Sequence, residues 1–368
     1  MRINFILPFF SVRPIGGLKV AYEYGNELVA RGHQVTVIHP RFMRNIEQSK
    51  SMVRRLQSAA LNTRNRLWPR AGLSWQPLRD EVKLLSVIEP TSPNVPDADI
   101  VFATAWQTAE YVLNYPAQKG RKFYLVMDFD PWIAPREVLQ KTWNWPLEKI
   151  AISDWLGEKV RAAGCSSADV TSIPIGINFE RFHLTNQLED RPKTILMVFS
   201  NSESKGSKDG LKALALVRQK HRDVRVTFFG PAYRRRPPGL PDWAEYYGNI
   251  PDHELRRLYN QSRIYVCSSL AEGFALPPAE AMACGCAVAA TDCGGIREFA
   301  IDRDNALLSP AGDPEKLASN ILRLLDDDQL RVSLAQRGLE SIQQFTWQAA
   351  AGKLETVIGA KPLAFAAA

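Results

Sequence analysis

The chain alternates between short apolar stretches and longer amphipathic ones. Residues 3–9 are apolar almost throughout, as expected of a strand that is buried on both faces. Residues 13–40 then supply a Gly-Gly loop, an amphipathic helix and a second apolar stretch. A strand, a helix and a strand within so short a segment predict two parallel strands that are joined by a right-handed crossover.

The same order continues through the first half of the chain. Residues 98–105 and 122–129 predict further parallel strands, and residues 146–164 predict a strand followed by a helix. The sequence then becomes polar and loses its periodicity, which is typical of a linker. We therefore expect an N-terminal domain at residues 1–180 and a linker at residues 181–192.

A second series of strands and helices follows the linker. We expect apolar strands at 193–200, 224–230, 263–269 and 286–291, and helices at 209–221, 252–261, 313–327 and 329–345. Two successive units of this kind predict an α/β fold with two doubly wound Rossmann-like domains facing a cleft, the second domain spanning residues 193–345. We expect a last helix at 346–360 to cross back to the N-terminal domain.

The composition agrees with a soluble globular protein. The 368 residues are enough for two domains, and 45% of them are hydrophobic and 23% charged. No apolar run reaches the roughly 18 residues that span a bilayer, and the N-terminus does not resemble a secretory signal, so we expect a cytoplasmic protein. The five cysteines contain no C-x-x-C pair, which argues against a zinc site and favours buried thiols.

The positive charge is concentrated in one segment. The net charge is +7, and Arg41 to Arg70 holds eight basic residues and one acid, Glu47, which equals the whole excess. Apolar residues recur in this segment near helical spacing, so it predicts a basic amphipathic helix. Two interpretations stay open: an anionic membrane surface, met at the inner membrane face, or a solvated helix with a basic face. We do not expect nucleic-acid binding, because no recognition motif accompanies the charge.

The most informative stretch is SLAEGFALPPAEAMACGC, from Ser269 to Cys286. Glu272 and Glu280 lie eight positions apart around a loop and a Pro-Pro pair. Proline suits the first turn of a helix, so we expect a helix from that pair to Gly285. The free N–H groups and the dipole at its N-terminus form an anion site, whose usual occupant is a diphosphate.

The two glutamates extend this anion site at both ends. A carboxylate suits a vicinal diol because it offers two acceptor oxygens. We expect Glu280 to accept hydrogen bonds from ribose hydroxyls and Glu272 to accept them from a sugar ring, which together describe a nucleotide-sugar. The alternative for Glu280 is a first-turn position that stabilises the helix dipole by about 0.3–1 kcal/mol without any ligand.

These residues carry a resemblance to a known family. The stretch from Ser268 to Phe299 resembles the E-x7-E signature of glycosyltransferase family 4, whose members have the GT-B fold. Residues 14–38 resemble the Gly-rich loop and first crossover of that family, and residues 170–182 its interdomain segment. The resemblance implies a retaining transferase in which Glu272 lies by the donor sugar and Glu280 holds the ribose.

Two positions depart from the family pattern. The family usually has an arginine and, five residues on, a lysine that neutralise the diphosphate; the lysine matches Lys205, but Ser200 occupies the arginine position. The family often has a histidine after a central strand, and we expect Asp128 or Asp130 in its place. A similar aromatic-acidic stretch occurs in members that build surface polysaccharides, including rhamnosyltransferases.

The function that we expect is transfer of a hexose, with retention and without a metal or other cofactor, from a nucleotide-sugar to a glycan or lipid-linked acceptor in cell-surface polysaccharide synthesis. The predicted catalytic residues are Glu272, Lys205 and Asp128. The predicted donor-binding residues are Gly16, Gly17, Lys205, Glu272, Gly273, Phe274, Ala275, Leu276 and Glu280.

Other functions remain open from the sequence. A nucleotide-sugar epimerase has the same fold and needs no acceptor, and a non-catalytic glycan-binding protein would transfer nothing. Asp128 and Asp130 also resemble the D-x-D motif of metal-dependent transferases. A nicotinamide dehydrogenase is disfavoured, because Pro14 to Lys19 lacks the G-x-G-x-x-G pattern.

Overall fold

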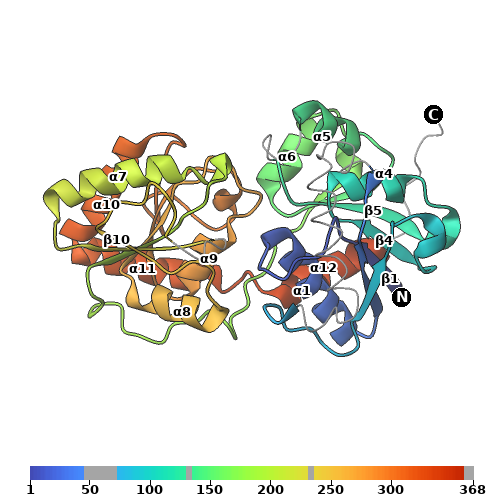
Figure 1. Ribbon diagram of the computed structural model, residues 1–368, viewed down its shortest axis with the longest axis horizontal. Coiled ribbons are helices and arrows are strands. Elements are labelled where there is room, and N and C mark those ends of the chain that lie inside the picture. The colour runs from blue at the N-terminus through green and yellow to red at the C-terminus, as the bar shows by residue number, and fades with distance from the viewer. Residues whose placement is uncertain (45–72, 130–134, 231–235, 360–368) are drawn as a thin grey trace. The chain divides into compact units, whose positions relative to one another are not determined.

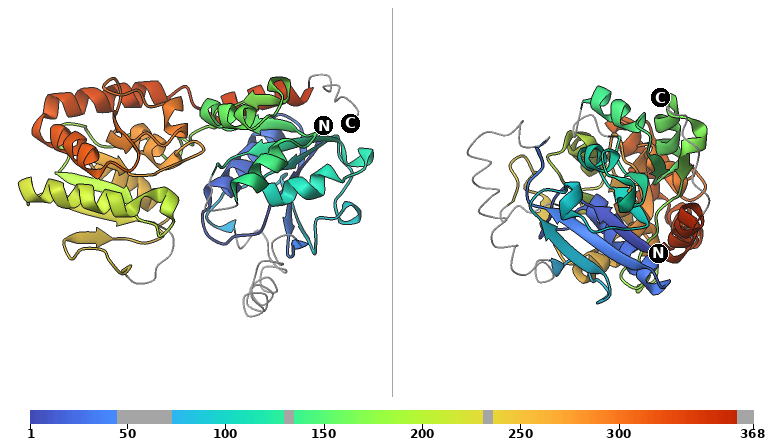
Figure 2. Two further views of the ribbon diagram at one scale, coloured as in Figure 1. Left: turned by 90° about the horizontal axis from the view of Figure 1, so that it is seen from above. Right: turned by 90° about the vertical axis from the view of Figure 1, so that its right-hand side faces the viewer.

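A computed structural model describes residues 1–44, 73–129, 135–230 and 236–359 (Figures 1 and 2). These residues form two compact units. The first unit runs from Met1 to Met127, from 135 to Ile175, and from Trp347 onwards. The second unit contains Gly176–Thr346, and Asp128 and Phe129 group with it.

The first unit is built on a parallel sheet. Its strands in the described residues are β1 (Arg2–Ile6), β2 (Gln34–Pro40), β3 (Lys83–Val87), β4 (Ile100–Ala103), β5 (Arg121–Val126), β6 (Glu148–Ala151) and β7 (Val170–Ser172). They lie in the order β3-β2-β1-β4-β5-β6-β7. Helices α1 (Gly16–Ala30), α4 (Trp106–Leu113), α5 (Arg136–Trp143), α6 (Asp154–Ala162) and α12 (Trp347–Gly359) cover the sheet.

The second unit repeats this plan (Figure 1). Its strands are β8 (Thr194–Val198), β9 (Arg225–Phe229), β10 (Ala244–Tyr246), β11 (Ile264–Cys267), β12 (Ala287–Thr291) and β13 (Leu307–Ser309), in the order β10-β9-β8-β11-β12-β13. The helices are α7 (Ser207–Lys220), α8 (Asp252–Gln261), α9 (Leu276–Ala283), α10 (Pro314–Asp326) and α11 (Asp328–Ile342).

Both sheets confirm the doubly wound α/β fold. Central strands such as β11 and β12 are buried along their whole length, because helices cover both faces of a parallel sheet. In each sheet the strand order reverses once, between β1 and β4 and between β8 and β11. Loops that follow the strands at such a reversal are the usual ligand-binding positions of this architecture.

The division of the chain differs from the predicted one. The first unit ends at Ile175 rather than at residue 180, and residues 181–192 are part of the second unit instead of a free linker. The reason is that the polar segment hides buried anchors: Phe182 and Arg191 are 1% and 2% exposed. Helix α12 belongs to the first unit, where it packs on α1 with the Trp347 ring 5.4 Å from that of Tyr24.

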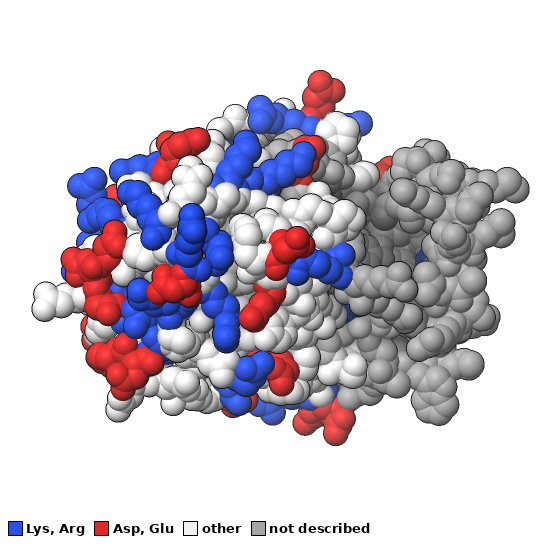
Figure 3. Space-filling model, turned by 60° about the vertical axis from the view of Figure 1, so that its left-hand side comes forward, with Lys and Arg blue, Asp and Glu red and all other residues white. Residues whose placement is uncertain are grey.

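Most of the basic segment Arg41 to Arg70 lies outside the described residues, and only its first members, Arg41 and Arg44, are within them. On the face seen in Figure 3, basic and acidic side chains are interspersed rather than separated. Within the described part of the chain, none of the helices is long and apolar enough to cross a membrane.

Candidate active site

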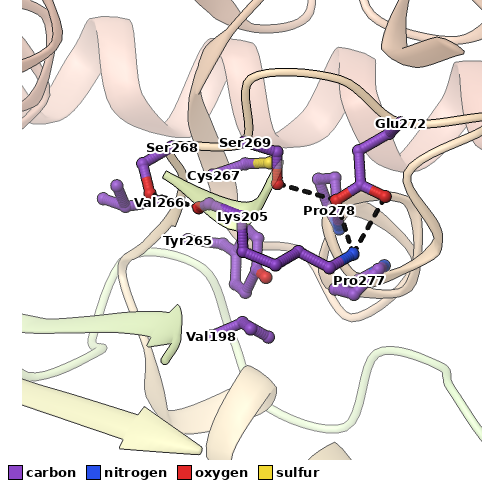
Figure 4. A pocket seen from close by; sticks show the side chains of 10 residues that line it. All are labelled: Val198, Lys205, Tyr265, Val266, Cys267, Ser268, Ser269, Glu272, Pro277 and Pro278. Carbon is purple, nitrogen blue, oxygen red and sulfur yellow. Dashed lines mark hydrogen bonds and ion pairs between the residues drawn. The ribbon is translucent and has the colours of Figure 1, made fainter. Parts of the chain in front are cut away.

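Lys205 and Glu272 meet where the strand order of the second sheet reverses. Lys205 ends a short turn between β8 and α7, and Glu272 follows β11. The Lys205 Nζ atom is 2.7 and 2.9 Å from the two carboxylate oxygens of Glu272, and Ser269 Oγ donates to Glu272 Oε1 at 2.7 Å (Figure 4). The sequence thus placed both residues after strands, and the fold brings their charged groups into contact.

The backbone holds this contact through a close approach of two loops. Gly206 has a φ of 56°, and a Cβ atom there would lie 1.9 Å from the Ser268 carbonyl oxygen, so only glycine fits. Ser268 Oγ donates to the Lys205 carbonyl at 3.0 Å, and the Leu270 amide donates to the Ser204 carbonyl at 2.7 Å. Lys205 is therefore positioned by its backbone as well as by its side chain.

The electrostatics keep Lys205 charged. Burial alone would lower its pKa, but the attraction and hydrogen bonds of Glu272 outweigh burial, and the pKa of Lys205 is raised. Asp128 adds a smaller contribution in the same direction. The side chain of Lys205 is 32% exposed and that of Glu272 is 16% exposed, so a ligand can still reach the pair.

The loop after Glu272 is anchored at its start. The Glu272 amide donates to the Cys293 carbonyl at 2.9 Å, and the Gly295 amide donates to the Glu272 carbonyl at 3.0 Å. A Cβ atom at Gly295 would lie 2.3 Å from the Gly273 carbonyl oxygen, so the two backbones are in direct contact. Phe274 is buried against the rings of Phe299 and Phe345. Its backbone, and not its side chain, is therefore the part that could contact a donor substrate.

Helix α9 begins where the sequence predicted, with Pro277 and Pro278 in its first turn. Proline has no N–H group, so these two residues cannot donate to an anion. The amide donors must come from the loop, Gly273 to Leu276, whose N–H groups have no partner within the part of the chain that the structure describes. We therefore expect the predicted anion site to be formed by the loop more than by the helix.

The sequence predicted Glu280 in the first turn of the helix, and the structure places it one turn further on. The first turn of α9 contains no acidic residue, and Glu280 lies in the second turn with only 5% of its surface exposed. A dipole effect decays beyond the first turn, so the interpretation as a first-turn capping residue is wrong. A buried carboxylate is costly and needs another reason.

A small pocket marks the Lys205–Glu272 pair. Its volume is about 20 Å³, and Val198, Lys205, Tyr265, Val266, Cys267, Ser268, Ser269, Glu272, Pro277 and Pro278 line it (Figure 4). Ligand pockets usually measure about 300–1,000 Å³, so this space suits only one end of a ligand. Sequence reasoning missed Ser269, although it lies within the quoted motif, because a hydroxyl has no spacing signature.

The other predicted residues lie elsewhere. Gly16 and Gly17 open α1 after β1 in the first unit; a Cβ atom would meet nothing within 4 Å at Gly16 and Met127 Cε at 3.4 Å at Gly17. Asp128 follows β5 and groups with the second unit.

The cysteine expectation has a structural counterpart. Cys165, Cys267, Cys284, Cys286 and Cys293 are all free and buried. Among the described residues, no cluster of three or more His, Cys, Asp or Glu side chains is placed to hold a metal ion. Asp130, the second acid of the alternative D-x-D motif, lies outside the described residues.

Comparisons with known proteins agree with this geometry. The family described as "Glycosyl transferases group 1" matches residues 178–341. The chain is 36% identical to O-antigen chain mannosyltransferase B of Escherichia coli, over 29% of this chain and 27% of that protein. It is 25% identical to phosphatidyl-myo-inositol mannosyltransferase of Mycobacterium leprae, over 97% of this chain and 96% of that protein.

A solved structure extends the likeness to both units. HepE of Anabaena, solved in complex with UDP-glucose, matches 98% of this chain and 99% of its own with a TM-score of 0.74 and 15% identity, which supports the fold. The family match covers the strands, the loops and the two glutamates that build the Lys205 site. The chain thus resembles the group 1 glycosyltransferases over residues 178–341, and its two Rossmann-like domains have the GT-B fold.

Proposed function

We propose that this glycosyltransferase moves a hexose from a nucleotide-sugar to a hydroxyl of a glycan or lipid-linked acceptor, with retention and without a metal, in cell-surface polysaccharide synthesis. The observation that carries the proposal is the Lys205–Glu272 pair at the reversal of the second sheet. Two relatives are named as mannosyltransferases of an O-antigen chain and of phosphatidyl-myo-inositol, and one structural neighbour holds UDP-glucose. These names support the donor and acceptor classes.

The donor would lie along the loop from Glu272 to Glu280. Glu280 accepts hydrogen bonds from the ribose diol, and Glu272 accepts them from hydroxyls of the sugar. The loop amides from Gly273 to Leu276 bind the diphosphate together with Lys205. Binding therefore exchanges the Lys205–Glu272 ion pair for two contacts with the donor.

The reaction breaks the bond between the sugar C1 atom and the diphosphate oxygen, and forms a bond from the acceptor oxygen to C1 on the same face. The electron pair of the broken bond leaves with the diphosphate, and the acceptor hydroxyl proton passes to that leaving oxygen. Lys205 and the loop amides stabilise the charge that develops there. Ser200 adds no charge: its hydroxyl accepts from the Ser202 amide at 3.1 Å.

The proposal is tested by separating the nucleotide from the sugar. Glu280→Gln should weaken nucleoside diphosphate binding by about tenfold, because a charge-assisted hydrogen bond is lost. Glu272→Gln should impair turnover of the full donor more than nucleoside diphosphate binding. Glu315→Gln, an exposed change on α10, is the control. Equal losses for both ligands in Glu272→Gln would show that Glu272 does not contact the sugar.

The stereochemistry and the metal are tested on the same protein. NMR of the product should show the same anomeric configuration as the donor. Inversion would refute retention, and an isomerised donor without transfer would indicate an epimerase.

Activity should survive a chelator, because Lys205 and amides take the place of a divalent ion. Loss with EDTA and recovery with manganese would instead favour the Asp128 and Asp130 site.

A further inference from the structure

Two of the buried cysteines lie beside the Lys205–Glu272 pair and take no part in the mechanism above. Cys267 is the last residue of β11, and Cys293 follows β12, the parallel neighbour of β11 in the sheet. The two thiols form a hydrogen bond with each other, so their sulfur atoms are neighbours although the residues are far apart in the sequence. Two adjacent thiols are the starting arrangement for a disulfide.

One of the two thiols can be reached from the pocket. Cys267 lines the pocket together with Lys205 and Glu272, whereas Cys293 is only 1% exposed (Figure 4). The pocket has a volume of about 20 Å³, which is enough for a molecule of about the size of water. Hydrogen peroxide is an oxidant of nearly this size, whereas glutathione disulfide is far larger. The class of oxidant that fits the pocket is therefore a small peroxide.

The hydrogen bond between the thiols gives them different reactivities. It is the largest influence on both groups, and it lowers the pKa of Cys267 and raises the pKa of Cys293. Burial and the nearby Glu272 carboxylate raise both pKa values, but for Cys267 the hydrogen bond outweighs them. The thiolate is the form of cysteine that attacks an oxidant. Cys267, which is both the more acidic thiol and the accessible one, is therefore the first to react.

We propose that hydrogen peroxide converts Cys267 and Cys293 to a reversible disulfide, which inactivates the Lys205–Glu272 site. The Cys267 sulfur attacks one peroxide oxygen and becomes a sulfenic acid; the O–O bond breaks, and the other oxygen leaves as water with the proton that Cys267 gave up. The Cys293 sulfur then attacks the Cys267 sulfur, and its proton leaves with the hydroxyl group as a second water. Formation of the disulfide does not depend on the proposed transferase function, whereas the loss of donor turnover does.

The disulfide acts on Glu272 through the backbone. The Glu272 amide donates to the Cys293 carbonyl at 2.9 Å, and Ser269, two residues after Cys267, donates from Oγ to the Glu272 carboxylate at 2.7 Å. Thr291 Oγ1 donates to the Ser269 carbonyl at 2.5 Å, which ties the ends of β11 and β12 to each other. A disulfide bond is only about 2.05 Å long, so its formation must draw these two ends together. Both groups that hold Glu272 therefore move when the bond forms.

Peptide mapping of the full chain after treatment with a small excess of hydrogen peroxide tests the bond directly. Cleavage after glutamate places Cys267 and Cys293 on different peptides, because Glu272 and Glu280 lie between them. We expect a cross-link between Cys267 and Cys293, assigned by fragmentation, that disappears on reduction. Donor turnover should fall as the cross-link appears, by up to about a hundredfold, which is the usual cost of a displacement of about 1 Å at a reacting centre. It should return on reduction.

Three variants separate the roles of the thiols. Cys293→Ala lacks the second thiol, so the sulfenic acid of Cys267 should proceed to the sulfinic acid, and reduction should no longer restore turnover. Cys267→Ala should keep in peroxide whatever turnover it has without peroxide. Cys165→Ala removes a buried thiol of the first unit and is the control, which should form the cross-link as the parent does.

Several outcomes overturn the inference. A parent chain that forms no cross-link between Cys267 and Cys293 does so without the need for any variant. So does a peroxide-treated Cys293→Ala whose turnover returns fully on reduction, or a Cys267→Ala that loses turnover as fast as the parent. Failure of the transferase proposal gives a different pattern, in which the cross-link forms and is reduced as expected but no donor is turned over before or after.

Discussion

At the scale of single residues, Ala275 is the most unusual member of the loop between Glu272 and α9. Its φ of 68° lies in the left-handed region, and among the described residues Arg303 is the other non-glycine with a positive φ. This conformation costs an L-amino acid about 1–2 kcal/mol. Ala275 immediately precedes α9 and is buried, so packing of the loop holds it there. Strain at such a position is typical of a preorganised site.

We expect Ala275→Gly to stabilise the protein by up to about 1 kcal/mol, since glycine relieves the strain but raises the entropy of the unfolded chain. The same change should weaken donor binding a few-fold, because the loop loses its preorganisation. Urea unfolding and calorimetry measure the two effects. Ala281→Gly, within α9, is the control and should destabilise by about 1 kcal/mol. Equal destabilisation in both variants would show that Ala275 is not strained.

His39 makes a prediction for pH. Burial lowers the pKa of His39 to about 4 from an ordinary value of 6.5, so the folded chain keeps it neutral. The contribution of neutral His39 to the free energy of unfolding is complete above pH 6.5. It is lost as the pH falls to about 4, because the unfolded chain binds the proton first, and the loss amounts to at most about 3 kcal/mol. His39→Phe keeps an aromatic ring beside Phe10 and should remove this part of the pH dependence.

The check is urea unfolding at about pH 7.5 and about pH 5. The parent and His253→Phe, an exposed change on α8, should lose more stability between the two conditions than His39→Phe. If all three lose the same amount, His39 does not titrate as its burial requires.

At the scale of elements, the segment predicted as a linker turns out to support helix α9. Arg191 donates to the carbonyl oxygens of Cys284 at 2.7 Å, Gly285 at 2.9 Å and Ser262 at 3.0 Å. The first two lie at the carboxyl end of α9, where carbonyl groups lack partners within the helix. A buried guanidinium therefore caps the helix that carries Glu280.

Arg191→Met should destabilise the second unit by about 3 kcal/mol or more, because several buried carbonyl groups lose a charged donor. Thermal unfolding with and without nucleoside diphosphate measures this effect and the accompanying loss of affinity. Lys193→Met, which removes an exposed ion pair with Asp223, should cost less than about 1 kcal/mol. Similar costs for the two variants would contradict the capping role.

The basic segment makes a separate prediction, which concerns residues outside the described part of the chain. Replacing Arg54, Arg55, Arg64 and Arg66 with glutamine should weaken binding to anionic vesicles, because each basic residue near such a surface contributes about 1 kcal/mol. Co-sedimentation at low and high salt measures this, since salt screens the attraction. A matched variant changes the exposed Lys208, Lys212, Lys220 and Arg222 of the second unit. A parent chain that fails to sediment at low salt would leave only a solvated basic face.

At the scale of the whole molecule, the two units have separate cores, but the first unit contains residues from both ends of the chain. Helix α12 follows the second unit in sequence, yet its buried residues belong to the first. Arg121 donates to the carbonyl groups of Val357 and Ile358 at its end, and Arg31 bonds to Glu355 at 3.1 Å. The first unit is therefore complete only when the last helix has been made.

Trp347→Ala should destabilise the first unit by about 3–5 kcal/mol, the usual cost of removing a buried tryptophan. Calorimetry should show a lower transition temperature for the first unit, while nucleoside diphosphate still raises the transition temperature of the second unit. Trp155→Ala, on the less buried surface of α6, is the comparison. A loss of nucleotide stabilisation in Trp347→Ala would show that the units do not unfold independently.

The local pattern of the chain was enough for the fold class and for one half of the site. Burial of a parallel strand and the crossover to the next are encoded within neighbouring residues, so the central strands of both sheets were predictable. The loop between Glu272 and Glu280 was also predictable, because both residues belong to one strand–loop–helix segment. The short strands β3, β7, β10 and β13 had no such signal, since their stability comes from pairing with a neighbour.

Tertiary structure alone decided the remaining features. The Lys205–Glu272 pair joins residues 67 positions apart, and no local spacing reports that two charges will meet. The polar segment around Arg191 looked like a linker, because sequence does not distinguish a solvated arginine from one whose partners are distant carbonyl groups. The second-turn position of Glu280 depended on where α9 begins, which is set by the left-handed conformation of Ala275 and by packing of Phe274. Hydrogen bonds and ion pairs act through space, so they appear only once the sheets have assembled.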